Sequence, residues 1–122
     1  MPVWSMGYPG QRKHEEVQIV CLPGQMLLPG FVNGHNHMYG VLSHGITAEA
    51  MVTDFSDYLK DFWWPCVEDR VDHDLARITA RWACVEMIDS GVTSFVDILE
   101  GPNSIPGALE VEKEEVEKAG LR

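Results

Sequence analysis

Basic residues are scarce in this sequence: 9 lysines and arginines stand against 19 aspartates and glutamates, and the formal net charge is −10. Such a balance repels phosphate groups, so we expect no nucleic-acid partner. Long apolar runs are also missing. No stretch of about 18 apolar residues occurs, which argues against a membrane-spanning helix. The N-terminus has no basic segment followed by an apolar one, so we expect no secretory signal and a cytoplasmic protein.

Cysteine is rare as well, and its spacing excludes two kinds of site. Cys21, Cys66 and Cys84 are far apart and form no C-x-x-C pair. Zinc ribbons and thioredoxin-like redox sites both use that pair, so neither is expected. The simplest interpretation is three reduced, mostly buried thiols in a cytosolic protein.

The first half of the chain contains extended segments and one short helix. Residues 17–22 read as a strand, and residues 25–33 as a second extended segment that leads to His35. A helix is expected over 53–62, ending before Pro65 because proline biases the preceding residue away from helical angles. The sequence between residues 38 and 71 has no long regular element, and such connections often bind substrate.

The second half predicts a helix, a strand and another helix. The helix over 74–90 is amphipathic, with Asp72 as its expected N-cap and Gly91 just past its end. Its apolar stripe consists of Leu75, Ile78, Trp82 and Val85, and it is widened by Ala76, Ala83 and Met87. The strand over 92–99 is nearly continuously apolar, as in strands buried on both faces. The helix over 106–119 is expected to bury Leu109 and Val116 and to expose its five glutamates to water. This order predicts parallel strands covered by helices.

Two histidines spaced i, i+2 follow the second extended segment. Alternate side chains of a strand point to the same face, so His35 and His37 would present both imidazoles to one side. Two converging neutral imidazoles make half a site for zinc, iron or another imidazole-preferring ion. A metal there would supply a hydroxide nucleophile near neutral pH. A catalytic site needs about three protein ligands, so the pair by itself is incomplete.

Three further residues are weaker candidates, each with a plainer alternative. His44 follows the pair and could touch a substrate, although an exposed loop histidine would look the same. Trp64 could form a wall of a pocket for a planar ring, or it could simply pack in the loop. Asp97 lies near the end of the strand over 92–99, where it could hydrogen-bond to the metal ligands and orient them. A structural carboxylate satisfied by hydrogen bonds is the alternative.

Three segments resemble the amidohydrolase superfamily, most closely its cytosine deaminase, chlorohydrolase and S-adenosylhomocysteine deaminase-like branch. They are MLLPGFVNGHNH at residues 26–37, WACVEMIDSGVTSFVD at 82–97 and EKAGLR at 117–122. The resemblance extends from about Val17 to the C-terminus. It implies an α/β fold: the first two βα units of a (β/α)8 TIM barrel, preceded by a remnant of a small β-sandwich.

The resemblance also implies domains, ligands and a reaction. Residues 1–24 would be an irregular segment with the remnant of the β domain, and residues 25–122 the N-terminal part of the barrel. His35 and His37 would bind a divalent metal ion, with zinc expected and iron the alternative. The reaction would be hydrolysis of a non-peptide C–N bond or a C–halogen bond in a small molecule.

An incomplete enzyme is the expectation that follows. In such enzymes the other metal ligands and the proton-shuttling acids belong to strands beyond the second, and a full barrel needs roughly 250 residues. We therefore expect no catalytic residue in this chain and no activity from it alone. Two alternatives remain open. One is a non-catalytic metal-binding protein that shares its histidines across a homo-oligomer, and the other is a degenerate truncated product that folds poorly.

Overall fold

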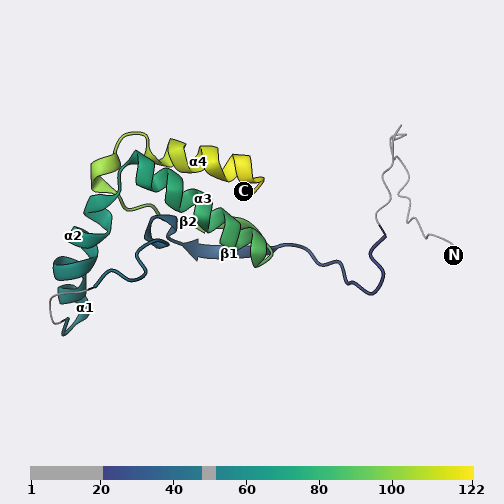
Figure 1. The fold of residues 1–122 in the computed structure, drawn as a ribbon, viewed down its shortest axis with the longest axis horizontal. Coiled ribbons are helices and arrows are strands. Elements are labelled where there is room, and N and C mark those ends of the chain that lie inside the picture. Colours follow the sequence, from purple (N-terminus) through teal and green to yellow (C-terminus); the bar gives the residue numbers. More distant parts are fainter. Residues whose placement is uncertain (1–20, 48–51) are drawn as a thin grey trace.

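The computed structural model describes residues 21–47 and 52–122 (Figure 1). In this part of the chain, β1 (Phe31–Asn36) and β2 (Val92–Asp97) form a two-stranded parallel sheet. Helix α3 (His73–Asp89) connects the strands, and α4 (Ala108–Ala119) follows β2. The predicted alternation of parallel strands and helices is confirmed. The predicted strand over 17–22 lies outside the described residues, except for Cys21 and Leu22, which belong to no strand.

The sheet continues beyond β2 through the backbone of Arg122. Its N–H donates to the Thr93 carbonyl at 3.2 Å, and its carbonyl accepts from the Phe95 N–H at 2.9 Å. One residue bonded in this way to two alternate residues is the pairing of parallel strands. On the first strand, a Cβ at Gly30 would collide with the Thr93 side chain, so glycine permits the close approach at the start of β1. Arg122 thus occupies a third parallel position, reached through α4.

Helix α3 starts and ends where its sequence predicts. The Asp72 carboxylate caps it by accepting from the Leu75 N–H at 2.8 Å, and Gly91 ends it with φ of 80°. Its buried face agrees with the predicted one at Ala76, Ala83 and Met87 but differs at the larger side chains. That face consists of Ala76, Thr79, Ala80, Ala83, Cys84 and Met87. Ile78, Trp82 and Val85 are exposed, Trp82 by 51%. The prediction centred the face on large side chains, whereas α3 packs on its neighbours mainly through small ones.

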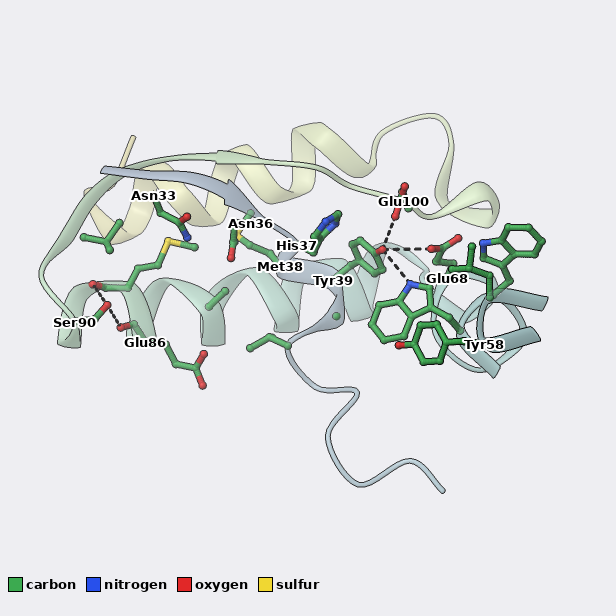
Figure 2. A pocket seen from close by; sticks show the side chains of 18 of the residues that line it. Asn33, Asn36, His37, Met38, Tyr39, Tyr58, Glu68, Glu86, Ser90 and Glu100 are labelled. Atoms are coloured by element: carbon green, nitrogen blue, oxygen red, sulfur yellow. Dashed lines mark hydrogen bonds between the residues drawn. The ribbon is translucent and has the colours of Figure 1, made fainter. Parts of the chain in front are cut away.

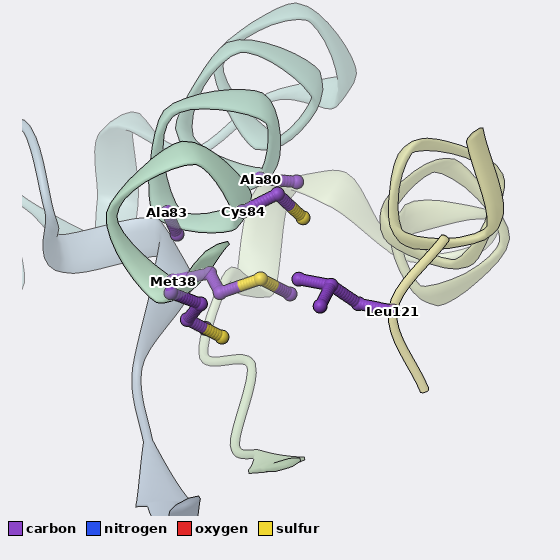
Figure 3. Packing of buried hydrophobic residues seen from close by; sticks show 6 residues of the cluster. Met38, Ala80, Ala83, Cys84 and Leu121 are labelled. Carbon is purple, nitrogen blue, oxygen red and sulfur yellow. The ribbon is translucent and has the colours of Figure 1, made fainter. Parts of the chain in front are cut away.

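Met38 fills the core between the strands and the helices. Its side chain packs against Ala80, Ala83, Cys84 and Met87 of α3 and against Leu121, just after α4 (Figure 3). A second buried group contains Tyr39, Val67, Val71 and Ala76. The turn that follows β1 therefore supplies one large side chain to each cluster, and this fixes the turn on the helices.

Helix α4 and strand β2 correct the predicted burial. Glu112 and Glu115 are each only 4% exposed, whereas Leu109 is 66% exposed. Glu115 is buried because it faces the arginines of α3, so the glutamates are not all on a solvated face. Strand β2 is only partly buried, since the helices of the described part cover one of its faces. Val116 is half-buried, as predicted.

The segment before α3 is more helical than expected. Helix α1 (Phe55–Asp57), a π-helical turn (Tyr58–Trp63) and α2 (Trp64–Cys66) follow one another without a break. The prediction that the helix ends before Pro65 is wrong. The wider π turn just before the proline relieves the clash of its ring with the preceding turn.

The structure can be compared with two further expectations, the burial of the cysteines and the lack of a membrane-spanning helix. Cys84 is buried and Cys66 half-buried, whereas Cys21 is exposed, so burial of the thiols is less complete than expected; all three are free thiols. Within residues 21–47 and 52–122, no helix has the length and apolar character needed to cross a membrane.

Candidate metal centre

Strand β1 brings the two predicted histidines to a common point. His35 lies within the strand and His37 directly follows it. Their Nε2 atoms are 3.0 Å apart, and the rings meet edge-on with 4.9 Å between centroids. The alternation of side chains along the strand produces this convergence, as the spacing predicts.

The orientation of the His37 ring is fixed by the loop after β2. Its Nδ1 lies 3.1 Å from the carbonyl oxygen of Ile98. Because a carbonyl oxygen only accepts hydrogen bonds, Nδ1 carries the proton and Nε2 keeps its lone pair. Histidine ligands of metals usually have this arrangement, with the second nitrogen bonded to a carbonyl or carboxylate.

The geometry of the pair fits two ligands of one divalent ion. Histidine nitrogens lie about 2.1 Å from zinc, so two of them are about 3.4 Å apart at a tetrahedral angle and about 3.0 Å apart when the angle at the ion narrows to about 90°. The observed separation of the Nε2 atoms is 3.0 Å. No cluster of three or more histidine, cysteine or acidic side chains suited to a metal occurs in the described ranges. The separation of the two Nε2 atoms fits a metal role for His35 and His37, which stays a prediction.

Asp97 stabilises the turn that carries His37. Its Oδ1 accepts from the Met38 N–H at 2.8 Å and from the Asn36 side-chain amide at 3.0 Å. Its Oδ2 is buried and has no hydrogen-bond partner among the residues that the structure describes. Burial raises the pKa of Asp97, and the two hydrogen bonds oppose that rise. Asp97 thus bonds to the residues on either side of His37, and a direct role beside a metal stays a prediction.

A cavity of about 850 Å³ opens beside His37 (Figure 2). Its walls come from β1 and the turn after it, from the π-helical segment, from α3 and from the loop after β2. Trp64 lines this cavity, where a substrate ring could reach it. His44 is exposed on the following turn and is not among the lining residues, so its predicted contact with substrate has no support from the cavity.

The Tyr39 hydroxyl is the centre of a polar cluster in this cavity (Figure 2). It donates to Glu100 Oε2 at 2.6 Å and accepts from the Trp63 indole N–H at 3.3 Å. Glu68 Oε1 lies 3.4 Å from the same hydroxyl. Burial raises the pKa of Tyr39 and also that of Glu68, and the charge of Glu100 raises both further. Two carboxylates thus share one phenol close to the histidines.

The comparisons with known proteins agree with this arrangement. The model of the Amidohydrolase family matches residues 26–122. The chain belongs to the amidohydrolase family. Members of this family generally use a divalent metal, and the family suggests a TIM barrel. No solved structure is significantly similar to the chain.

Curated relatives of this amidohydrolase include deaminases. The chain is 38% identical over 99 residues to a 5'-deoxyadenosine deaminase of Methanothermobacter thermautotrophicus, covering 81% of this chain and 21% of the relative. It is 32% identical over 111 residues to a 5-methylthioadenosine/S-adenosylhomocysteine deaminase of Bacillus cytotoxicus, covering 90% and 24%. A deaminase of the same name from Saccharophagus degradans is 32% identical over 89 residues, covering 73% and 19%. The chain thus spans about a fifth to a quarter of the length of these relatives.

Sequence reasoning overlooked three residues of the polar cluster. Glu100 lies just after β2, and that position was an available signal, because barrel enzymes place functional groups after the strand ends. Tyr39 continues the i, i+2 spacing of the histidines, which also could have drawn attention to it. Glu68 carried no signal, because only the folding of the segment between α2 and α3 brings it to this amidohydrolase cavity.

Proposed function

We propose that these residues form the first two βα units of a metal-dependent amidohydrolase barrel that deaminates a small molecule. The convergence of the His35 and His37 Nε2 atoms, with the His37 tautomer fixed by Ile98, carries this proposal. The names of the relatives favour cleavage of a C–N bond over a C–halogen bond. We expect no turnover from the described residues by themselves, because no third metal ligand joins the pair.

The pair would hold zinc, or iron as the alternative, through the two Nε2 atoms. When bound, such an ion supplies the Lewis acidity that makes water a nucleophile near neutral pH. The protein's own residues keep the pair in position. Ile98 holds the tautomer and angle of the His37 ring, and Asp97 holds the Met38 backbone that follows it.

The proposed substrate class is a 5'-substituted adenosine, as in the names of the relatives. A drug-sized or nucleoside-sized ligand fits a cavity of several hundred Å³ with apolar walls and few polar groups. Trp63 and Trp64 provide flat apolar walls for a purine ring in this cavity. The oxygens of Glu68 and Glu100 are acceptors suited to hydroxyl groups of a substrate.

Metal binding tests the site. Titration of the purified chain with Zn²⁺ in a calorimeter should show one stoichiometric site, and His35→Ala with His37→Ala should remove it. His73→Gln is the matched control: His73 caps the loop at the Ser104 and Pro106 carbonyls, and glutamine can still donate there. Unchanged zinc stoichiometry in the double variant, with a native circular-dichroism spectrum, would contradict the assignment.

A chimera tests the reaction. Residues 26–122 replace the matching segment of the M. thermautotrophicus deaminase, and release of ammonia from 5'-deoxyadenosine is measured. We expect the chimera to deaminate this substrate and its His37→Ala version to lose at least about 100-fold in rate, since a metal ligand is removed. A chimera that folds and binds zinc but has no activity would sink the proposed function.

A further inference from the structure

We infer that Tyr39 is a positioning residue for His37, and that Glu100 and Trp63 hold the Tyr39 side chain in its orientation. The inference rests on the proposed function of the histidine pair as metal ligands. It assigns a role to a cluster that the pair itself does not explain.

The ring of Tyr39 contacts the ring of His37. The Tyr39 and His37 rings meet at right angles with 5.7 Å between centroids. Edge-to-face pairs of this kind are favourable and restrict rotation of both rings. Tyr39 is only 3% exposed, so its ring has no freedom to move away. His37 is thereby held twice, by Ile98 at Nδ1 and by Tyr39 at the side of the ring.

The hydroxyl end of Tyr39 is fixed by groups from distant parts of the chain. The hydroxyl donates a charge-assisted hydrogen bond to Oε2 of Glu100, in the loop after β2, at 2.6 Å. Trp63, at the end of the π-helical turn, donates to the same oxygen at 3.3 Å. The Trp63 ring also meets the Tyr39 ring edge-on with 6.1 Å between centroids. Three elements thus converge on one residue that touches the metal ligand.

The arrangement exceeds what packing of a buried tyrosine requires. One hydrogen-bond partner satisfies a phenol. Here Glu68 also approaches the hydroxyl, and no ion pair with Glu68 or Glu100 occurs in the described ranges. Trp63 also lies in a π-helical turn, and such turns frequently occur at functional sites. Both features fit a cluster whose task is to orient a ligand.

The test uses Tyr39→Phe, which keeps the ring and removes the hydroxyl, and Glu100→Gln, which weakens the acceptor. Tyr58→Phe is the matched control, because Tyr58 stacks on Trp63 while no hydrogen bond of its hydroxyl appears in the described part. Zn²⁺ affinity is measured by calorimetry. Long-range ¹H–¹⁵N spectra of the metal-free protein report the His37 tautomer at a pH above histidine protonation.

We expect Tyr39→Phe and Glu100→Gln to weaken Zn²⁺ binding by about 10- to 100-fold, the usual effect of removing support from a metal ligand. The His37 signals should shift toward a mixture of tautomers in both variants and stay unchanged in Tyr58→Phe. Wild-type zinc affinity and wild-type His37 signals in folded Tyr39→Phe would overturn the inference and leave the metal site standing. If the wild-type chain binds no zinc, the proposed function fails, and the tautomer spectra alone decide on Tyr39.

Discussion

Helix α4 buries two glutamates three residues apart in opposite electrostatic surroundings. Glu115 faces α3, where Arg81 bonds to it at 2.5 Å and 3.3 Å and Lys118 at 2.8 Å. These cations lower the pKa of Glu115 to about 2. Glu112 faces the end of β2, where burial and then the charge of Asp97 raise its pKa to about 7. One Glu112 oxygen has no hydrogen-bond partner among residues 21–47 and 52–122.

The difference shows which buried carboxylates are neutralised by nearby cations and which are not. Cations surround the Glu115 carboxylate, which lies between α3 and α4, the two helices of the scaffold. The carboxylates nearer the histidines, Glu68, Asp97 and Glu112, all have a raised pKa with burial as the largest cause. Perturbed carboxylates of this kind gather at functional sites more often than elsewhere. Two of these acids, Glu68 and Asp97, approach Tyr39 and Met38, which directly follow the histidine pair.

The largest expected effect on stability comes from truncating Met38, which contacts both α3 and the Asp97 carboxylate. Met38 bonds to Asp97 through its N–H and packs on α3 through its side chain. Met38→Ala should lower the free energy of unfolding by about 3 kcal/mol, because it leaves a cavity in a close-packed core. Urea denaturation measures the change. Met26→Ala is the control, since Met26 is 81% exposed, and a similar small loss in both variants would refute the assigned core.

A smaller effect is expected when the charge of Glu112 is removed. A carboxyl whose pKa rises on folding stabilises the protein below its unfolded pKa of 4.5, and that stability is lost as the pH rises through about 7. Glu112→Gln should therefore raise the free energy of unfolding at pH ~8 by about 1 to 2 kcal/mol, less than the full equivalent of the pKa change because the protein relaxes around a buried charge. Urea denaturation at pH ~5 and ~8 measures it. The exposed Glu110→Gln should show no such gain, and an equal gain there would contradict the role of burial.

The smallest effect concerns Glu115 and has the opposite sign. Because folding lowers its pKa, its contribution is present above pH 4.5 and is lost as the pH falls toward about 2. Glu115→Gln should flatten the acid limb of a thermal-stability profile and lower stability near neutral pH. The effect should stay below that of Glu112, since Arg81 and Lys118 are largely exposed and screened by water. Glu117→Gln, in an exposed pair with Lys113, is the control, and an equal change there would count against the Glu115 cluster.

Much of the fold could be predicted because its signals are local. The Asp72 cap, Gly91 and the order of strands and helices depend on neighbours in the sequence, and the structure confirms them. The convergence of His35 and His37 follows from the two-residue period of a strand. The segments that resemble the amidohydrolase superfamily led to the right family. Each of these predictions needed only a few consecutive residues.

The features that were mispredicted depend on which faces meet. Local sequence does not say that α3 packs through its alanines and exposes Trp82, because both faces are apolar. It also does not say that two of the five glutamates of α4 are buried, since the arginines that receive Glu115 belong to another helix. Pro65 remains within a helical segment because the π turn before it makes room for the ring.

The sequence by itself determined the family, the parallel order of the elements and the shared face of the two histidines. These are properties of short motifs and of backbone periodicity, which hold wherever the segment lies. Only the tertiary structure decided that Ile98 fixes the His37 ring, and that Glu68, Glu100 and Trp63 surround Tyr39. These contacts join residues 24 to 61 positions apart, so their geometry exists only after the strands and helices have packed.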